Sequence, residues 1–140
     1  MNIKDIEAIP LNMRFKPDLE QSVLRSGLRA GKGRVTLYRV ELANGVVGYG
    51  EHLNGPDDVT EFIGQNAVAG LVQIRHAGVQ MALYDAVGKA LGVPAHELMG
   101  RQVRDKVPFA YWSCELSPEN WAEQAQKAAG LGYRVYKFKC

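Results

Sequence analysis

Two lysines near the end of the chain have the type and spacing of catalytic side chains. Lys137 and Lys139 lie in the segment 134–139, Arg-Val-Tyr-Lys-Phe-Lys, whose alternation predicts a β-strand. Because successive side chains of a strand point to opposite faces, both ammonium groups share one face and Tyr136 and Phe138 share the other. Two like charges one pleat apart disfavour double protonation, and a neutral amine is the form that acts as a base. The alternative is an ordinary charged strand end in solvent, because Lys-x-Lys is common by chance.

The elements before this strand help to decide between a catalytic pair of lysines and a charged strand end in solvent. Residues 107–112 also predict a strand, Ser117-Pro118 is typical of a helix start, and Gly130 and Gly132 are typical of its end. Strand, helix and strand in this order form a parallel crossover unit, and parallel strands are covered on both faces. Two lysines on an interior face are costly unless that face lines a polar cavity, such as the mouth of a barrel.

The first hundred residues predict a different architecture. Strands are expected at 3–10, 35–42 and 46–50, and Ala43-Asn44-Gly45 supplies a tight turn between the last two, so the three form an antiparallel meander. Asp57 or Asp58 could cap a short helix that runs to residue 63. Residues 78–91 form the best helix, ended by Gly92 and Pro94. Its apolar stripe consists of Val79, Ala82, Leu83, Ala86, Val87, Ala90 and Leu91.

Composition excludes several classes of protein. The chain of 140 residues is 46% hydrophobic and 23% charged, which is ordinary for a domain with its own core. A net charge of +2 does not indicate nucleic-acid binding, and no stretch is apolar enough to span a membrane. The first residues lack the apolar core of a signal peptide, so we expect a cytoplasmic protein. Its two cysteines, Cys114 and Cys140, are expected to be free thiols.

Four segments together resemble the enolase superfamily, and within it the branch of mandelate racemase and muconate-lactonizing enzymes. They are Gly48-Tyr-Gly-Glu51, the helix 78–94 with its Ala-Leu-Tyr-Asp core, the stretch 97–108, and Gly132-Tyr-Arg-Val-Tyr-Lys-Phe-Lys139. The resemblance implies an α+β N-terminal capping domain, a three-stranded antiparallel meander plus helices, over residues 1–106. It also implies that residues 107–140 start a (β/α) TIM-type barrel, with its first strand, first helix and second strand. Because a complete barrel takes about 250 residues, we expect a fragment truncated after the second strand.

The resemblance also implies a chemistry. Enzymes of this type remove the α-proton of a carboxylate substrate to give an enediolate, and the dianion needs a strong electrostatic partner and a base of matched pKa. In members with Lys-x-Lys the second lysine is the base, so Lys139 is the expected base and Lys137 its cationic neighbour. The cofactor would be Mg²⁺, with ligands beyond the end of this chain. Racemization or epimerization, acid-sugar dehydration and cycloisomerization share this first step, so the residues present leave the outcome open.

Further substrate contacts are expected from two loops and one strand end. A basic connection at 12–33 carries Arg14, Arg25 and Arg29 and could fold over an anionic ligand, although a solvated loop is the alternative. Glu51 and His52 open the family's second specificity loop, although a surface histidine is equally plausible. Ser113 lies where the first barrel strand ends.

Three smaller expectations complete the interpretation. Asp85 and Lys89 should form a plain i, i+4 ion pair, and His76 and His96 should be structural or exposed. Only residues 52–77 separate the meander from the long helix, so we expect a trimmed cap.

The alternative function is a non-catalytic capping module whose basic loop binds anionic ligands. The partner would be a small carboxylate substrate, with neither nucleic acid nor membrane involved, and the complete protein is expected to form a homo-oligomer.

Overall fold

The computed structural model describes residues 1–13, 33–53, 56–113 and 116–138, and these form two compact units. The first unit contains residues 1–13 and 34–103, and the second contains the described residues from 104 onward. None of the helices in the described ranges is long and apolar enough to cross a membrane.

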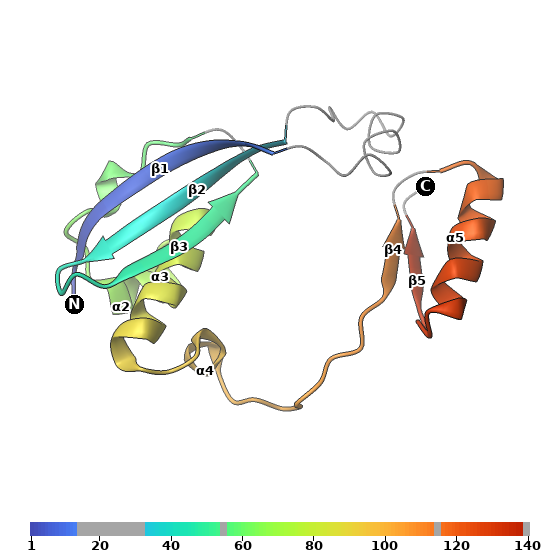
Figure 1. The fold of residues 1–140 in the computed structure, drawn as a ribbon. Coiled ribbons are helices and arrows are strands. Elements are labelled where there is room, and N and C mark those ends of the chain that lie inside the picture. Colours follow the sequence, from blue (N-terminus) through green and yellow to red (C-terminus); the bar gives the residue numbers. More distant parts are fainter. Residues whose placement is uncertain (14–32, 54–55, 114–115, 139–140) are drawn as a thin grey trace. The chain divides into compact units, whose positions relative to one another are not determined.

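The sheet of the first unit is the antiparallel meander that the sequence predicts (Figure 1). Strands β1 (Ile3–Met13), β2 (Gly33–Leu42) and β3 (Val47–His52) lie in the order β1-β2-β3. The β2–β3 register runs from Glu41 opposite Val47 to Thr36 opposite His52. Gly45 has a φ of 82° in the turn between these strands, a conformation that glycine adopts without steric cost.

Four helical segments follow the sheet among the described residues of the first unit. They are the 3-10 turn η1 (Thr60–Phe62) and the α-helices α2 (Ala67–Gln73), α3 (Ala77–Leu91) and α4 (Ala95–Met99). The sequence predicted α3 to within one residue but missed α2 and α4. The short helix expected from Asp57 or Asp58 is a single 3-10 turn, in which the Asp58 carboxylate accepts hydrogen bonds from the Thr60 amide and hydroxyl.

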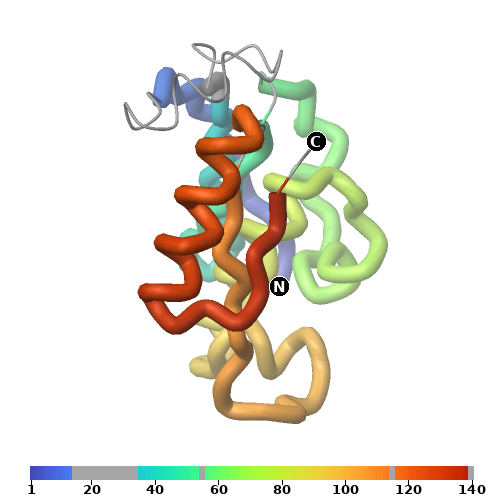
Figure 2. Tube along the Cα trace, turned by 90° about the vertical axis from the view of Figure 1, so that its right-hand side faces the viewer, coloured from blue at the N-terminus to red at the C-terminus, as the bar shows by residue number. Residues whose placement is uncertain are grey.

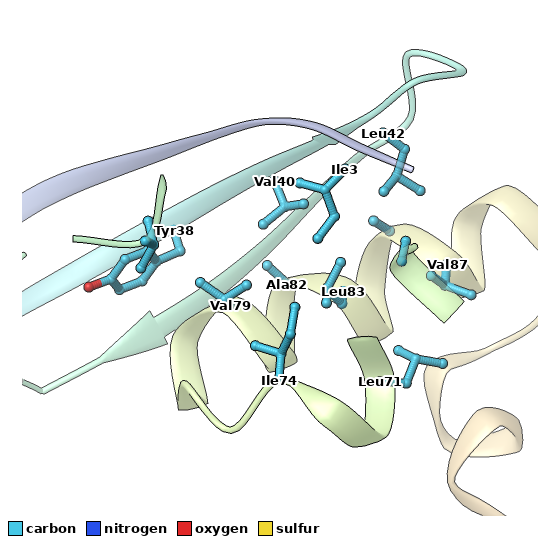
Figure 3. Packing of buried hydrophobic residues seen from close by; sticks show 13 residues of the cluster. Ile3, Tyr38, Val40, Leu42, Leu71, Ile74, Val79, Ala82, Leu83 and Val87 are labelled. Atoms are coloured by element: carbon cyan, nitrogen blue, oxygen red, sulfur yellow. The ribbon is translucent and has the colours of Figure 1, made fainter. Parts of the chain in front are cut away.

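The core lies between the sheet and helices α2 and α3 (Figure 3). Thr36, Tyr38, Val40 and Leu42 are all buried, so every second residue of β2 from Thr36 onward faces the core. The opposing residues of α3 that are fully buried are Val79, Ala82, Leu83, Ala86 and Val87. The predicted stripe is wrong at its end, because Leu91 is 55% exposed. Gly92, with a φ of 71°, ends the helix directly after Leu91.

Helix α3 lies directly against β3 because both surfaces consist of very small residues. A Cβ atom added at Gly48 would lie 2.1 Å from the Ala82 carbonyl oxygen, and one added at Gly50 would lie 2.1 Å from that of Gly78. A Cβ atom at Gly78 would in turn meet the Tyr38 ring at 2.4 Å. Glycines at these three positions therefore let backbone pack on backbone and on the buried tyrosine ring.

Polar contacts fix the same helix along the strand. The predicted pair forms, with Lys89 Nζ 2.6 Å from Asp85 Oδ2, and both partners also reach β3. Asp85 accepts a hydrogen bond from the Tyr49 amide at 2.9 Å, and Lys89 donates one to the Val47 carbonyl at 3.1 Å. This pair therefore satisfies backbone groups of a strand that has a neighbour on only one side.

The second unit is a parallel β-α-β unit, as the sequence predicts. Strand β4 (Tyr111–Ser113) pairs in parallel with β5 (Tyr136–Phe138), and helix α5 (Pro118–Gly130) connects them and runs beside them (Figures 1 and 2). Ser117 caps α5 by accepting a hydrogen bond from the Asn120 amide, and Pro118 opens the helix, as expected. The predicted strand at 107–112 is wrong at residues 107–110, and the one at 134–139 is wrong at 134–135. Strand pairing within the described part extends only over the three residues that face each other.

The β3–α3 contact makes a direct prediction. Gly48→Ala should destabilise the first unit by roughly 1–3 kcal/mol or more, because the added methyl group must displace helix backbone rather than a flexible side chain. Urea unfolding followed by far-UV circular dichroism measures this loss. Gly130→Ala is the matched control, since a Cβ atom there meets nothing within 4 Å. Equal stability of both variants would contradict the close packing of α3 on β3.

A second prediction concerns acid stability. Glu41 accepts hydrogen bonds from Lys4 and Arg39, chiefly from Lys4, and these lower the pKa of its carboxyl from the ordinary 4.5. The stabilising contribution of a lowered carboxyl pKa is present above the unfolded-state pKa and is lost as pH falls through the folded-state value. Glu41→Gln should therefore reduce stability near pH 7, and the difference from the wild type should shrink below pH 4.5.

The control for this measurement is Glu7→Gln, which changes an exposed glutamate on β1. Urea midpoints at several pH values compare the two variants with the wild type. A Glu41→Gln effect that stays constant from neutral to acid pH would show that the ion pairs with Lys4 and Arg39 do not act through charge.

Candidate active site

The predicted catalytic strand has two different faces in the second unit. Phe138 lies against Trp121 of α5, with ring centroids 5.0 Å apart, and Tyr136 lies 5.7 Å from Phe138 on the same face. That face is therefore the one covered by the helix. Lys137, between the two aromatic residues, points to the opposite face and is exposed. The alternation that the sequence predicted is confirmed over Tyr136–Phe138.

One aromatic residue shares the face of Lys137. Trp112 of β4 pairs directly with Lys137 in the parallel register, and its indole is 44% exposed. Side chains of directly paired residues project to the same side of a sheet. The face that carries the predicted chemistry thus consists, in the described residues, of one ammonium group beside one indole ring.

Ser113 has a different environment. It is 7% exposed, and its hydroxyl lies 2.5 Å from the Tyr136 hydroxyl. Because Tyr136 belongs to the helix-covered face, Ser113 lies with the packed aromatic residues and not with Lys137. Its predicted contact with substrate stays a prediction, and the structure gives it a packing partner.

Four predicted site residues lie outside the described part of the chain. They are Lys139, Arg14, Arg25 and Arg29. The roles of the base and of the basic loop at 12–33 therefore stay predictions.

Glu51 and His52 lie at the end of β3 in the first unit. Glu51 is exposed and pairs with Leu37, whereas His52 is partly buried and faces Asp57 and His76. His76 is structural, as expected, because its Nδ1 accepts a hydrogen bond from the Val79 amide and so caps α3. From the sequence, Asp57 is expected only as a helix cap. Its contact with His76, nineteen residues away, is formed by chain folding and has no local signature in the sequence.

The described residues do not fit the expected magnesium ion. In the ranges that the structure describes, the one group of three candidate metal ligands is His52, Asp57 and His76. It offers two imidazole nitrogens and a single carboxylate, whereas Mg²⁺ prefers a shell of oxygen atoms.

The proteins to which this chain is similar are sugar-acid dehydratases by sequence and a cycloisomerase and an epimerase by structure. No family model matches the chain. It is 40% identical over 62 residues to D-galactonate dehydratase of Xanthomonas oryzae pv. oryzae, a match that covers 44% of this chain and 16% of that protein. It is 35% identical over 92 residues to D-xylonate dehydratase of Haloferax volcanii, covering 63% of this chain and 21% of that protein.

Solved structures match over nearly the whole chain. The muconate cycloisomerase of Pseudomonas fluorescens matches with a TM-score of 0.67 and 26% identity, covering 99% of this chain and 43% of that one. The dipeptide epimerase of Methylococcus capsulatus, solved with a Mg ion, matches with a TM-score of 0.71 and 20% identity, covering 100% and 44%. These relatives and solved structures are members of the enolase superfamily, and this chain is similar to them in sequence and in fold.

The architecture of the first unit agrees with this similarity. Its three-stranded antiparallel sheet with helices matches the N-terminal capping domain of the muconate-lactonizing group. The chain spans less than half the length of these enolase-superfamily structures and about a fifth or less of the length of the curated dehydratases.

Proposed function

We propose that this chain is the N-terminal part of an enzyme that removes the α-proton of a small carboxylate substrate. The reaction of the whole protein would be an isomerization, such as racemization, epimerization or cycloisomerization, or the dehydration of an acid sugar. The proposal is supported by the relatives, which are isomerases, an epimerase and sugar-acid dehydratases. The β4-α5-β5 unit would be the start of the (β/α) barrel.

The observation that carries the proposal is the orientation of Lys137. Its side chain lies on the face of β5 that α5 does not cover, while Tyr136 and Phe138 occupy the helix-covered face. In a (β/α) barrel the helices lie outside and the uncovered face of each strand lies inside. Lys139, two residues further along, would share that inner face by the period of a strand.

Lys139 is the proposed base. Its neutral amine takes the α-proton and becomes an ammonium, while the electron pair of the C–H bond moves into the carboxylate to give the enediolate. Lys137 stays cationic on the same face, lowers the fraction of doubly protonated lysines and attracts the substrate carboxylate. Mg²⁺, bound by parts of the protein that this chain does not span, would supply further positive charge to the enediolate.

The substrate contacts of Arg14, Arg25, Arg29, Glu51, His52 and Ser113 belong to the same proposal. The arginines would bring positive charge to an anionic substrate from the loop at 12–33. A sugar acid such as D-galactonate or D-xylonate is the first substrate to try, because the curated relatives are named for these two.

The test of the proposed base uses the full-length protein. Lys139→Ala should slow the exchange of the substrate α-proton with deuterium from solvent by roughly 10²–10⁴-fold, because an acid–base group typically contributes that much. Lys139→Arg should be nearly as slow, since a guanidinium does not release its proton at a useful pH. Exchange is measured by proton NMR on sugar acids in D₂O.

Lys127→Ala is the matched control, because Lys127 is exposed on α5 and should leave exchange unchanged. Normal exchange by a folded Lys139→Ala protein would show that another group is the base. Ligand binding without any exchange in the wild type would favour the alternative, a non-catalytic capping module.

A further inference from the structure

Three side chains of the first unit converge at the junction of β3 and α3. Asp57 Oδ2 lies 3.0 Å from His76 Nε2 and 3.6 Å from His52 Nδ1. His52 comes from the end of β3, and His76 comes from the residue that precedes α3. The two imidazole rings are 5.4 Å apart in an edge-to-face arrangement. We call these three residues the His-Asp-His cluster.

Two of the three separations between ligand atoms in the cluster are close to those of a tetrahedral transition-metal site. Zinc bonds of about 2.0–2.1 Å place neighbouring ligand atoms about 3.3–3.4 Å apart. The separations of Asp57 Oδ2 from His76 Nε2 and from His52 Nδ1, 3.0 and 3.6 Å, fall on either side of that value. All three donor atoms lie within 4.8 Å of one another, so only small side-chain shifts are needed for one ion to contact all three.

One donor atom of the cluster is unsatisfied. His52 Nδ1 is buried and has no hydrogen-bond partner, because its 3.6 Å separation from Asp57 is too long for a hydrogen bond. A buried polar atom without a partner is uncommon in folded proteins and calls for a specific explanation. A cation between His52 and Asp57 would satisfy this nitrogen.

We propose that the His-Asp-His cluster binds one divalent transition-metal ion, Zn²⁺ or a cation of similar ligand preference. His52 Nδ1, Asp57 Oδ2 and His76 Nε2 supply three ligands. Water completes the tetrahedron, since the Asp57 side chain is 48% exposed and the site is open to solvent. The donor set separates this site from the magnesium ion of the proposed function, because two imidazole nitrogens suit Zn²⁺ and not Mg²⁺.

Metal binding requires a proton to move on His76. The ring accepts a hydrogen bond from the Val79 amide at Nδ1, so its proton is on Nε2, directed at Asp57. To bind a cation, Nε2 gives up this proton and Nδ1 takes one, which leaves the ring neutral. The Val79 amide then loses its acceptor. Metal binding thus exchanges one capping hydrogen bond for three metal–ligand bonds. It also changes the hydrogen bonding of the Val79 amide, which an NMR spectrum can detect.

The test is calorimetric titration of ZnCl₂ into this chain with both thiols removed by Cys114→Ser and Cys140→Ser. We expect one ion per chain, a shift of the Val79 amide resonance in the NMR spectrum, and visible absorption typical of tetrahedral Co²⁺ when Co²⁺ replaces Zn²⁺. MgCl₂ should give no comparable binding. His52→Ala and Asp57→Asn should each weaken Zn²⁺ binding at least tenfold, which is about 1.4 kcal/mol.

His76 needs a variant that keeps the helix start intact. His76→Asn removes the metal-binding nitrogen and leaves a residue type that caps helices well, so α3 should persist while Zn²⁺ binding weakens at least tenfold. His96→Ala is the matched control, because His96 lies on α4 outside the cluster. Absence of stoichiometric Zn²⁺ binding, or binding that survives His52→Ala, Asp57→Asn and His76→Asn, overturns the proposal. The proposed base, Lys139, is not part of the cluster, so the outcome leaves that assignment as it stands. Zn²⁺ binding would instead take His52 Nδ1 away from the proposed contact of His52 with substrate.

Discussion

The close approach of α3 to β3 is the contact on which the first unit depends. Gly48 and Gly50 present bare backbone to the helix, and an added Cβ atom at either position would come within 2.1 Å of a helix carbonyl oxygen. The approach brings the inward residues of β2 into contact with the buried stripe of α3, with Val40 and Val79 fully buried on either side. It also lets Asp85 and Lys89 reach the backbone of β3. The small residues at this interface therefore allow both the burial of the apolar side chains of β2 and α3 and the hydrogen bonds to the backbone of β3.

The same approach assembles the His-Asp-His cluster. Gly78 contacts the ring of Tyr38, whose hydroxyl accepts a hydrogen bond from the Asp57 amide at 3.1 Å. His76, two residues before Gly78, is thereby held beside the end of β3, where His52 lies. Polar side chains far apart in sequence meet here as a consequence of how closely a helix packs on a strand.

The second unit has a different physical character. Its two strands pair over three residues each, and large apolar side chains remain exposed, among them Phe109 at 81% and Val135 at 59%. An exposed apolar surface of this kind is typical of a region that packs against further structure. This agrees with the fact that solved relatives are more than twice as long as this chain. It also agrees with a lysine-bearing face that would be lined by further strands.

Sequence patterns predicted the elements with strong periodicity and missed those without it. The alternation of β2, the turn at Gly45 and the stripe of α3 each have a period that sets their geometry, and all three were predicted. Helix α2 was missed because it spans only Ala67–Gln73 and contains Gly70, so that its pattern is too short to separate from a loop. The strand at 107–112 was predicted too long, because alternation predicts a conformation but pairing decides where a strand exists.

The candidate site residues also fall into two groups, those whose placement local patterns predict and those whose placement depends on tertiary packing. Local alternation was enough to predict that Lys137 and Phe138 lie on opposite faces. The contact between Ser113 and Tyr136 depends on parallel register, and the cluster of His52, Asp57 and His76 depends on tertiary packing. Neither has a signature that can be found along the chain.

Amide hydrogen exchange on the 140-residue chain tests the central claim most directly, namely that the first unit is self-supporting and the second belongs to a larger sheet. The account predicts slow exchange for backbone amides at 35–42 and 47–50, which belong to the sheet packed on the core. It predicts much faster exchange at 136–138, where β5 pairs with a single short strand. Protection at 136–138 as strong as that in β2 would show that the second unit is already a finished sheet, and the assignment of Lys137 to the inner face of a barrel would be contradicted.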